Sequence, residues 1–414
     1  MRPTPRRVRH TATALAVTCL LAIAATATSA SAESARGLAR PAAAAAQEAV
    51  DHDMDHPPMS GTASVDDSGA WTTSGTFRTK DGWWASPIHV AALDDGRLWF
   101  VGIARNADPP ETATESRRVS WLFTPPAPGQ PVPAETTITE ITEPVAISMT
   151  AWGTRILDDD FYCMGATFDR TGRVVTAGGT RAAVSIAGEG TLAFGLPYLS
   201  TFDAGTWRRG PTMAAPGALG TSGRWYPTAT RLANGSILVT GGFELIDLRN
   251  PNQPGGLPNL TVETYDPQTG AQRVLSDAEH TPPAIHAGDY TQVFVLPFDQ
   301  PQDLLMIGER QVPVIGSAST ANSLAVAAPR RPGPEDDRPG YGTSSVMLPI
   351  RVENGDHGYT NGAVLVASGN MHTDYEHTAN VFDPVLRTWS GSLELGTARH
   401  HPSTLALPTV ASSS

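Results

Sequence analysis

A short pattern of apolar and polar positions recurs along the chain from residue 71 onward. Each recurrence has an apolar stretch, a turn, usually with glycine, and a second stretch rich in β-branched residues that ends at glycine. Two such stretches around a tight turn are typical of a β-hairpin. Proline, with 35 residues in the chain, is too frequent for long helices. The pattern therefore predicts an all-β protein with five hairpin units, at residues 88–102, 161–179, 224–242, 290–308 and 345–369.

A second signature follows several units: an aromatic residue, an aspartate, a turn and a tryptophan. It occurs at residues 202–207 and 382–389, where the aspartate favours the turn and the tryptophan covers the sheet edge. Gly179, Gly242 and Gly308, which close three successive units, are 63 and 66 positions apart. This spacing indicates a kelch-like β-propeller, with a period longer than the usual value of about 50 residues. An irregular all-β sandwich is the alternative.

The pattern breaks off near the carboxyl end. A sixth unit begins at residues 399–408, but no glycine turn and second strand follow it. We therefore expect residues 69–414 to form five hairpin units and the start of a sixth, as a partial, unclosed propeller. Such a fold exposes a strand edge, and a second chain that completes the propeller is one candidate partner.

The amino terminus has the composition of an export signal. Four arginines lie within the first nine residues, an apolar stretch follows at residues 15–25, and residues 30–32 offer a small-residue cleavage site. A membrane anchor is the alternative, but it needs about 20 apolar residues. We predict a signal peptide at residues 1–32 and a secreted, extracellular protein. Residues 33–68 are predicted to be a disordered linker, with weak candidate metal ligands among its histidines and methionines at 52–59.

The net charge limits the classes of partner that the chain can bind, and the cysteine content limits its covalent chemistry. Removal of the predicted signal, with four arginines and no acidic residue, changes the formal net charge from −12 to −16. Nucleic acid and anionic membranes are therefore poor electrostatic matches, and we expect neither as a partner. Only Cys163 lies beyond the signal, so an internal disulfide is excluded. A lone cysteine in an exported protein is either a buried small hydrophobic residue or a functional group.

Cys163 and Tyr226 stand at the heads of successive hairpin units. Cys163 follows an aromatic residue, and Tyr226 lies within residues 224–228, which read Arg-Trp-Tyr-Pro-Thr. With the kelch-like units from residue 71 to the carboxyl end, these frames resemble the galactose oxidase and glyoxal oxidase family of copper-radical oxidases.

The resemblance implies a thioether cofactor between Cys163 and Tyr226 beside copper. Tyr226 would be a copper ligand and the radical carrier, and Cys163 would be its covalent modifier, so both would be catalytic and cofactor-binding. The implied reaction oxidises a small alcohol or aldehyde with dioxygen and yields peroxide, while the protein orients and tunes the cofactor. We therefore expect the Cys163 sulfur to lie beside the Tyr226 ring, near one end of the propeller axis.

The family's copper site also contains a second tyrosine followed directly by histidine, and a further histidine. No Tyr-His pair occurs in this sequence. In one alignment His400 replaces the tyrosine and His401 is a metal ligand; in the other, residues 399–403 belong to the preceding blade and bind no metal. Glu244 stands where galactose oxidase has the aromatic residue that covers the radical. The sequence thus predicts an incomplete copper site and a weak or inactive oxidase.

Other histidines lie in polar loops. His372 and His377 flank acidic residues, and His280 and His286 flank a Pro-Pro pair. We interpret these stretches as loops rather than metal sites. The competing function is a non-enzymatic extracellular propeller that binds a glycan or a partner protein. The missing Tyr-His pair favours this alternative, and the Cys163–Tyr226 pair favours the oxidase.

Overall fold

Strands and turns make up the part of the chain that the computed structural model describes, and no helix occurs among these residues. The described residues, all within the unit Asp51–Ser414, are 75–106, 116–127, 130–141, 146–149, 155–158, 163–186, 190–203, 205–214, 217, 219–247, 255–282, 290–297, 303–308, 311–332, 343–348, 351–352, 359–360, 362–367, 378–395 and 404. The predicted signal peptide, the linker and all of the sixth unit except Thr404 lie outside these ranges. The described residues contain no helix that is long and apolar enough to cross a membrane.

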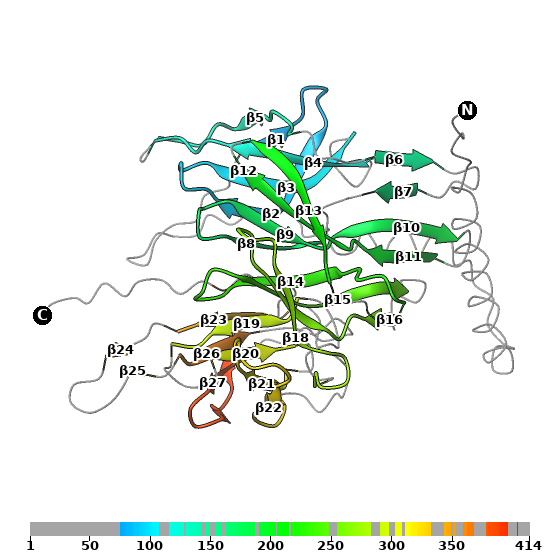
Figure 1. The fold of residues 1–414 in the computed structure, drawn as a ribbon. Helices are drawn as coiled ribbons and strands as arrows, with labels where there is room; N and C mark the ends of the chain where they lie inside the picture. The colour runs from blue at the N-terminus through cyan, green and yellow to red at the C-terminus, as the bar shows by residue number, and fades with distance from the viewer. Residues whose placement is uncertain are drawn as a thin grey trace, which may run out of the picture. The chain divides into compact units, whose positions relative to one another are not determined.

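Four sheets share one plan, in which four strands neighbour one another in chain order with antiparallel pairing (Figure 1). Repeated four-stranded sheets of this kind are the blades of a β-propeller. The strands of the first two are β8 (Gly165–Phe168), β9 (Val174–Ala177), β12 (Tyr198–Asp203) and β13 (Thr206–Thr212), then β14 (Trp225–Arg231), β15 (Ile237–Asp247), β17 (Val262–Tyr265) and β18 (Gln272–Ser276). Those of the other two are β19 (Gln292–Val295), β20 (Leu304–Ile307), β21 (Pro313–Gly316) and β22 (Ala325–Val326), then β23 (Ser344–Met347), β26 (Val364–Ala367), β27 (Thr378–Asp383) and β28 (Thr388–Trp389).

The sheet nearest the amino terminus differs from this plan, and several further strands are added to it and to the others. Three strands form its antiparallel core, with β1 added antiparallel to β2, and β5 added parallel to β1. Its strands are β1 (Thr76–Arg78), β2 (Trp84–Ala92), β3 (Leu98–Arg105), β4 (Ser116–Phe123) and β5 (Glu135–Thr137). The β14–β18 sheet also contains β10 (Thr180–Ile186), β11 (Gly190–Gly195) and β16 (Gly255–Pro258), and β29 (Leu393–Glu394) pairs with β27. Two further pairs form two-stranded sheets of their own: β6 (Ala146–Met149) with β7 (Arg155–Asp158), and β24 (Arg351–Val352) with β25 (Tyr359–Thr360).

All five predicted hairpins are confirmed, as the pairs β2–β3, β8–β9, β14–β15, β19–β20 and β23–β26. The prediction that the second strand ends at its glycine pair holds for β9, which ends at Ala177 before Gly178. It is wrong for β15, which continues through Gly241 and Gly242 to Asp247. The longer strand results from tertiary contacts, because β11 and β16 pair with the carboxyl-terminal part of β15 and extend it.

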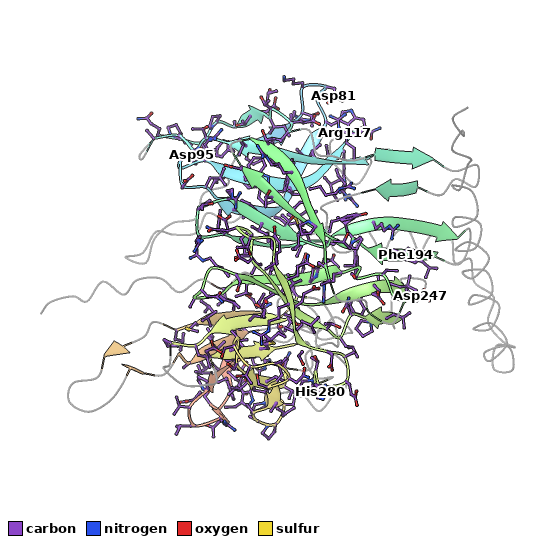
Figure 2. All side chains as sticks on the ribbon, in the orientation of Figure 1. Asp81, Asp95, Arg117, Phe194, Asp247 and His280 are labelled. Atoms are coloured by element: carbon purple, nitrogen blue, oxygen red, sulfur yellow. The ribbon has the colours of Figure 1, made fainter. Side chains whose placement is uncertain are left out.

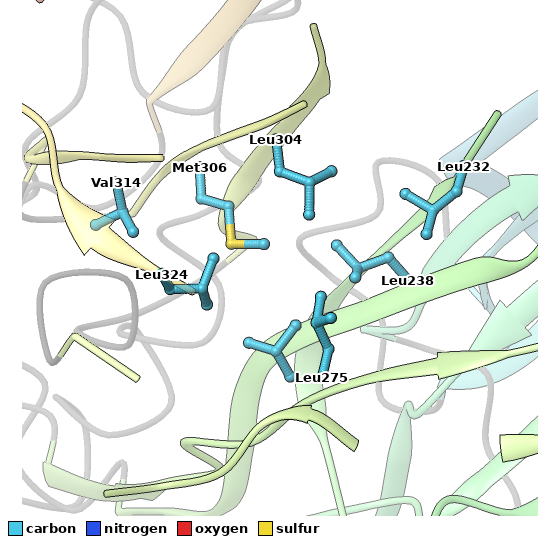
Figure 3. Packing of buried hydrophobic residues seen from close by; sticks show 8 residues of the cluster. Leu232, Leu238, Leu275, Leu304, Met306, Val314 and Leu324 are labelled. Atoms are coloured by element: carbon cyan, nitrogen blue, oxygen red, sulfur yellow. The ribbon is translucent and has the colours of Figure 1, made fainter. Parts of the chain in front are cut away.

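The second strand of a blade buries both of its faces. In β20, Leu304 and Met306 pack with residues of the β14–β18 sheet (Figure 3), whereas Leu305 and Ile307 pack with Val364 and other residues of the β23–β28 sheet. Alternate side chains of a strand point to opposite faces, so a strand between two sheets needs a continuous apolar stretch. Successive sheets therefore pack face to face, which is the packing of a propeller.

Asp169 holds the turn between β8 and β9. Its buried carboxylate accepts bonds from the Thr171 amide at 2.8 Å, the Thr171 hydroxyl at 2.7 Å and Nε of Arg173 at 2.8 Å. Burial by itself would raise the pKa of Asp169, but the bonds from Thr171 and Arg173 outweigh it and hold the pKa below the ordinary value of 3.8.

Replacing Asp169 with asparagine is expected to lower the free energy of unfolding at neutral pH by about 1–3 kcal/mol. Because the pKa is lower in the folded state, the contribution of the carboxylate is complete above about pH 4 and is lost as the pH falls through the folded-state pKa. Urea unfolding of both proteins across this range should show the difference shrinking in acid. Asp95→Asn, at an exposed aspartate that also bonds an arginine two residues on, is the control. A difference that stays constant with pH would contradict this account.

Candidate functional site

The heads of three successive inner strands are joined through their backbones. Cys163 lies two residues before β8, Tyr226 is the second residue of β14, and Tyr290 lies two residues before β19. The Tyr226 amide donates a hydrogen bond to the Cys163 carbonyl at 2.8 Å, and the Tyr290 amide donates one to the Tyr226 carbonyl at 3.1 Å. The blade order thus brings together residues that are far apart in the sequence.

All three residues have a left-handed backbone. Their φ angles are 65° at Cys163, 58° at Tyr226 and 46° at Tyr290. This region favours glycine, and side chains in it cost free energy that the surrounding structure must offset. Non-glycine residues that hold such conformations cluster at functional sites, so these three residues define the candidate site.

Cys163 lies in a buried apolar cluster, which Tyr226 borders. The cysteine has 1 % of its surface exposed. Ala193, Trp225, Phe243 and Ile246 complete the cluster, and the partly buried Tyr226 packs against it. The structure therefore brings the two sequence-predicted site residues together, with the cysteine on the side that water does not reach.

The Tyr226 ring lies between two other aromatic rings. The ring centroids of Trp225 and Tyr226 are 4.0 Å apart, and those of Tyr226 and Tyr290 are 4.8 Å apart with an angle of 67° between the planes. The Tyr290 ring is in turn 6.4 Å from that of His89, which lies at an irregularity in β2 next to Pro87. The site consequently extends from Cys163 through two tyrosines to a histidine.

His89 supplies an imidazole nitrogen with no partner in the described structure. The residue as a whole is partly exposed, but its Nε2 atom is buried and has no hydrogen bond. Burial lowers the pKa of His89 from 6.5 to about 4, so the ring is neutral at pH 7. A neutral imidazole keeps a lone pair that can bind a metal.

Sequence reasoning missed both Tyr290 and His89 as site residues. Tyr290 had a detectable signal, since it stands at the head of the first strand of its hairpin unit, as Cys163 and Tyr226 do. His89 had none, because its contact with Tyr290 joins two sheets and the apolar pattern of β2 does not reveal such a contact.

Arg224, the first residue of the Arg-x-Tyr frame, positions Tyr226. It is fully buried and donates bonds to the carbonyls of Gly241 and Thr261, both at 2.7 Å, and to Glu263 at 3.0 Å. Burial lowers the pKa of Arg224 and Glu263 opposes that shift. The backbone carbonyl of Arg224 accepts a hydrogen bond from the Gly179 amide at 2.9 Å. The arginine thus ties the head of β14 to the glycine pairs of two blades.

Glu244 has a structural role of its own. It is buried, and its carboxylate accepts bonds from the Leu219 amide at 2.5 Å, the Thr221 amide at 3.0 Å and the Thr221 hydroxyl at 2.8 Å. It therefore fastens the segment before Arg224 to β15.

Of the other histidines considered as possible metal ligands from the sequence, the structure describes only His280. His280 is exposed and bonds Asp277 at 2.7 Å, which raises the pKa of His280 (Figure 2). His401 and His400, like His286, His372 and His377, lie outside the described residues. Within the described ranges, no group of three or more His, Cys, Asp and Glu residues could hold a metal.

Copper nevertheless matches the donors near Tyr226. The phenols of Tyr226 and Tyr290 and the neutral imidazole of His89, with its buried, unpartnered Nε2 atom, are groups that bind this metal. A pocket of about 600 Å³, lined by Arg97, Glu140, Trp207 and others, contains none of these residues.

No protein-family model matches the chain, and no curated protein matches its sequence. Among solved structures, the chain is similar to a fungal alcohol oxidase of the AA5 family in complex with copper. The identity is 15 % and the TM-score 0.42, and the match covers 80 % of this chain and 68 % of that chain. The propeller assignment stands on the sheets and clusters described above.

Proposed function

We propose that this chain is an exported relative of the copper-radical oxidases, in which the Cys163 and Tyr226 side chains become joined by a thioether bond. The observation that carries the proposal is their meeting at adjacent blade heads, through a backbone bond of 2.8 Å and one shared buried cluster. A repeat fold alone requires neither a cysteine nor a tyrosine at a left-handed position, where glycine is the least strained residue.

Formation of the bond is an oxidation by two electrons. The S–H bond of Cys163 and a ring C–H bond ortho to the Tyr226 hydroxyl break, and a carbon–sulfur bond forms between them. Dioxygen accepts the two electrons and two protons and becomes hydrogen peroxide. Copper, when bound, supplies the one-electron chemistry that couples dioxygen to these groups.

The residues of the chain then have distinct tasks. Tyr226 is the metal-binding phenol, and the sulfur of Cys163 lowers the oxidation potential of its ring. Trp225 and Phe243 keep water from the sulfur, and Arg224 holds the frame in place. In the overall reaction a small alcohol loses two hydrogens to become an aldehyde, and dioxygen becomes peroxide. We expect a weak or inactive oxidase as encoded, since the sequence has no Tyr-His pair.

The purified chain, treated with Cu(II) and oxygen, is expected to lose the mass of two hydrogens relative to the chain kept with a chelator. Intact-mass measurement after thiol reduction excludes a disulfide between two molecules, because reduction breaks a disulfide and not a thioether. Fragmentation should link the peptides that contain Cys163 and Tyr226.

Cys163→Ser and Tyr226→Phe should both retain the unmodified mass, whereas the matched control Tyr198→Phe should lose two hydrogens as the wild type does. An unchanged wild-type mass would refute the oxidase proposal. It would leave the non-enzymatic propeller that binds a glycan or a partner protein, for which the pocket beside Trp207 is the candidate surface.

A further inference from the structure

Tyr290 lies beside Tyr226, and His89 lies beside Tyr290; the sequence resemblance assigns neither. Their rings follow one another from Tyr226, at centroid distances of 4.8 Å and 6.4 Å. They come from different blades, since His89 lies in β2 and Tyr290 precedes β19. The family pattern places its second tyrosine and its histidines in later units instead.

We propose that His89 and Tyr290 complete a copper site at Tyr226, with Nε2 of His89 and the phenol oxygens of Tyr226 and Tyr290 as the protein ligands. The inference rests on the proposed function for the role of Tyr226. It adds two ligands that replace the missing Tyr-His pair with residues from other positions in the propeller.

The burial of Nε2 is the first support for this site. A buried polar atom without a partner costs about 1–3 kcal/mol, and most buried polar groups in native structures have one. His89 Nε2 has no hydrogen-bond partner among the described residues. A metal ion is one partner that would satisfy a neutral ring nitrogen.

The backbone of Tyr290 is the second support. Tyr290 shares the left-handed conformation of Tyr226, and its amide is bonded to the Tyr226 carbonyl. The two residues are therefore adjacent through their main chains, and their ring centroids are 4.8 Å apart. Two phenolates would balance the charge of Cu(II), and nitrogen and oxygen donors together suit this ion, which also binds most tightly among the common divalent metals.

The test separates this inference from the thioether by using the Cys163→Ser background, in which the thioether cannot form. Cu(II) affinity is measured by competition with a chelator, and the bound ion is examined by electron paramagnetic resonance and optical absorption. We expect imidazole nitrogen coupling and a phenolate-to-Cu(II) absorption band. Adding His89→Ala should weaken binding by about tenfold or more and remove the nitrogen coupling. Adding Tyr290→Phe should weaken binding and reduce the absorption band.

His280→Ala is the matched control, because this exposed histidine is bonded to Asp277 and should change neither signal. The thermal unfolding of each metal-free variant shows whether it is folded, and His89→Gln replaces His89→Ala if the alanine variant is not. If His401→Ala removes the nitrogen coupling and His89→Ala or His89→Gln leaves it, the inference is wrong. Equal copper affinity with and without His89 would also overturn it, whatever the outcome of the mass measurement.

Discussion

Replacing Arg224 with alanine is expected to lower the free energy of unfolding by about 3–5 kcal/mol, because it leaves Glu263 as a buried charge without its partner. Both side chains are almost completely excluded from solvent, with 0 % and 3 % exposed. The variant also removes the donors to the carbonyls of Gly241 and Thr261. Each unsatisfied buried acceptor adds to the cost.

Denaturant unfolding followed by tryptophan fluorescence measures this change. The double variant Arg224→Met with Glu263→Leu should be less destabilised than Arg224→Ala, since apolar replacement of both partners leaves no unpaired charge. Arg97→Ala removes a partly exposed arginine that is paired with the exposed Asp95, and it should change the stability little. If Arg224→Ala proves as mild as Arg97→Ala, the anchoring role of Arg224 is wrong.

Replacing Gly178 with alanine is expected to destabilise the protein by about 3 kcal/mol, through backbone strain together with overpacking. Gly178 has a φ of +66°, and a Cβ atom there would lie 2.2 Å from the Arg224 carbonyl oxygen and 2.8 Å from Cγ of Pro227. Because the clash is with the Arg224 carbonyl and the Pro227 ring, on either side of Tyr226, relief of it must displace the head of β14.

Gly205→Ala separates the two causes. Gly205 also has a positive φ, +85°, but no heavy atom lies within 4 Å of an added Cβ. It should show only the smaller cost of the left-handed conformation, about 1–2 kcal/mol. Thermal or urea unfolding of both variants gives the comparison. Equal losses at the two glycines would show that the close approach at Gly178 contributes nothing.

The sequence was sufficient for the hairpins because their signals are local. A glycine turn reverses the chain, as at Gly172 and Gly235 with φ of 85° and 86°, and the stretches on either side supply the two strands. The burial of the second strands could also be predicted from the sequence. An unbroken apolar stretch such as Leu304–Ile307 fits a strand that is covered on both faces. The frames that hold Cys163 and Tyr226 are local in the same way.

Tertiary structure decided where strands extend and which side chains meet. β15 passes through its glycine pair because β11 and β16 offer hydrogen-bonding edges to it, and neither partner is visible in the pattern of β15 itself. The segment between β9 and β12 likewise gave no strand signal to predict the added hairpin of β10 and β11.

For the site, the sequence by itself determined that a cysteine and a tyrosine occupy equivalent places in successive units. Only the tertiary structure placed Tyr290 next to Tyr226 and His89 next to Tyr290, although these residues are distant along the chain. Local periodicity specifies strands and turns. The contacts between units depend on how the sheets pack face to face, and no pattern within one unit encodes them.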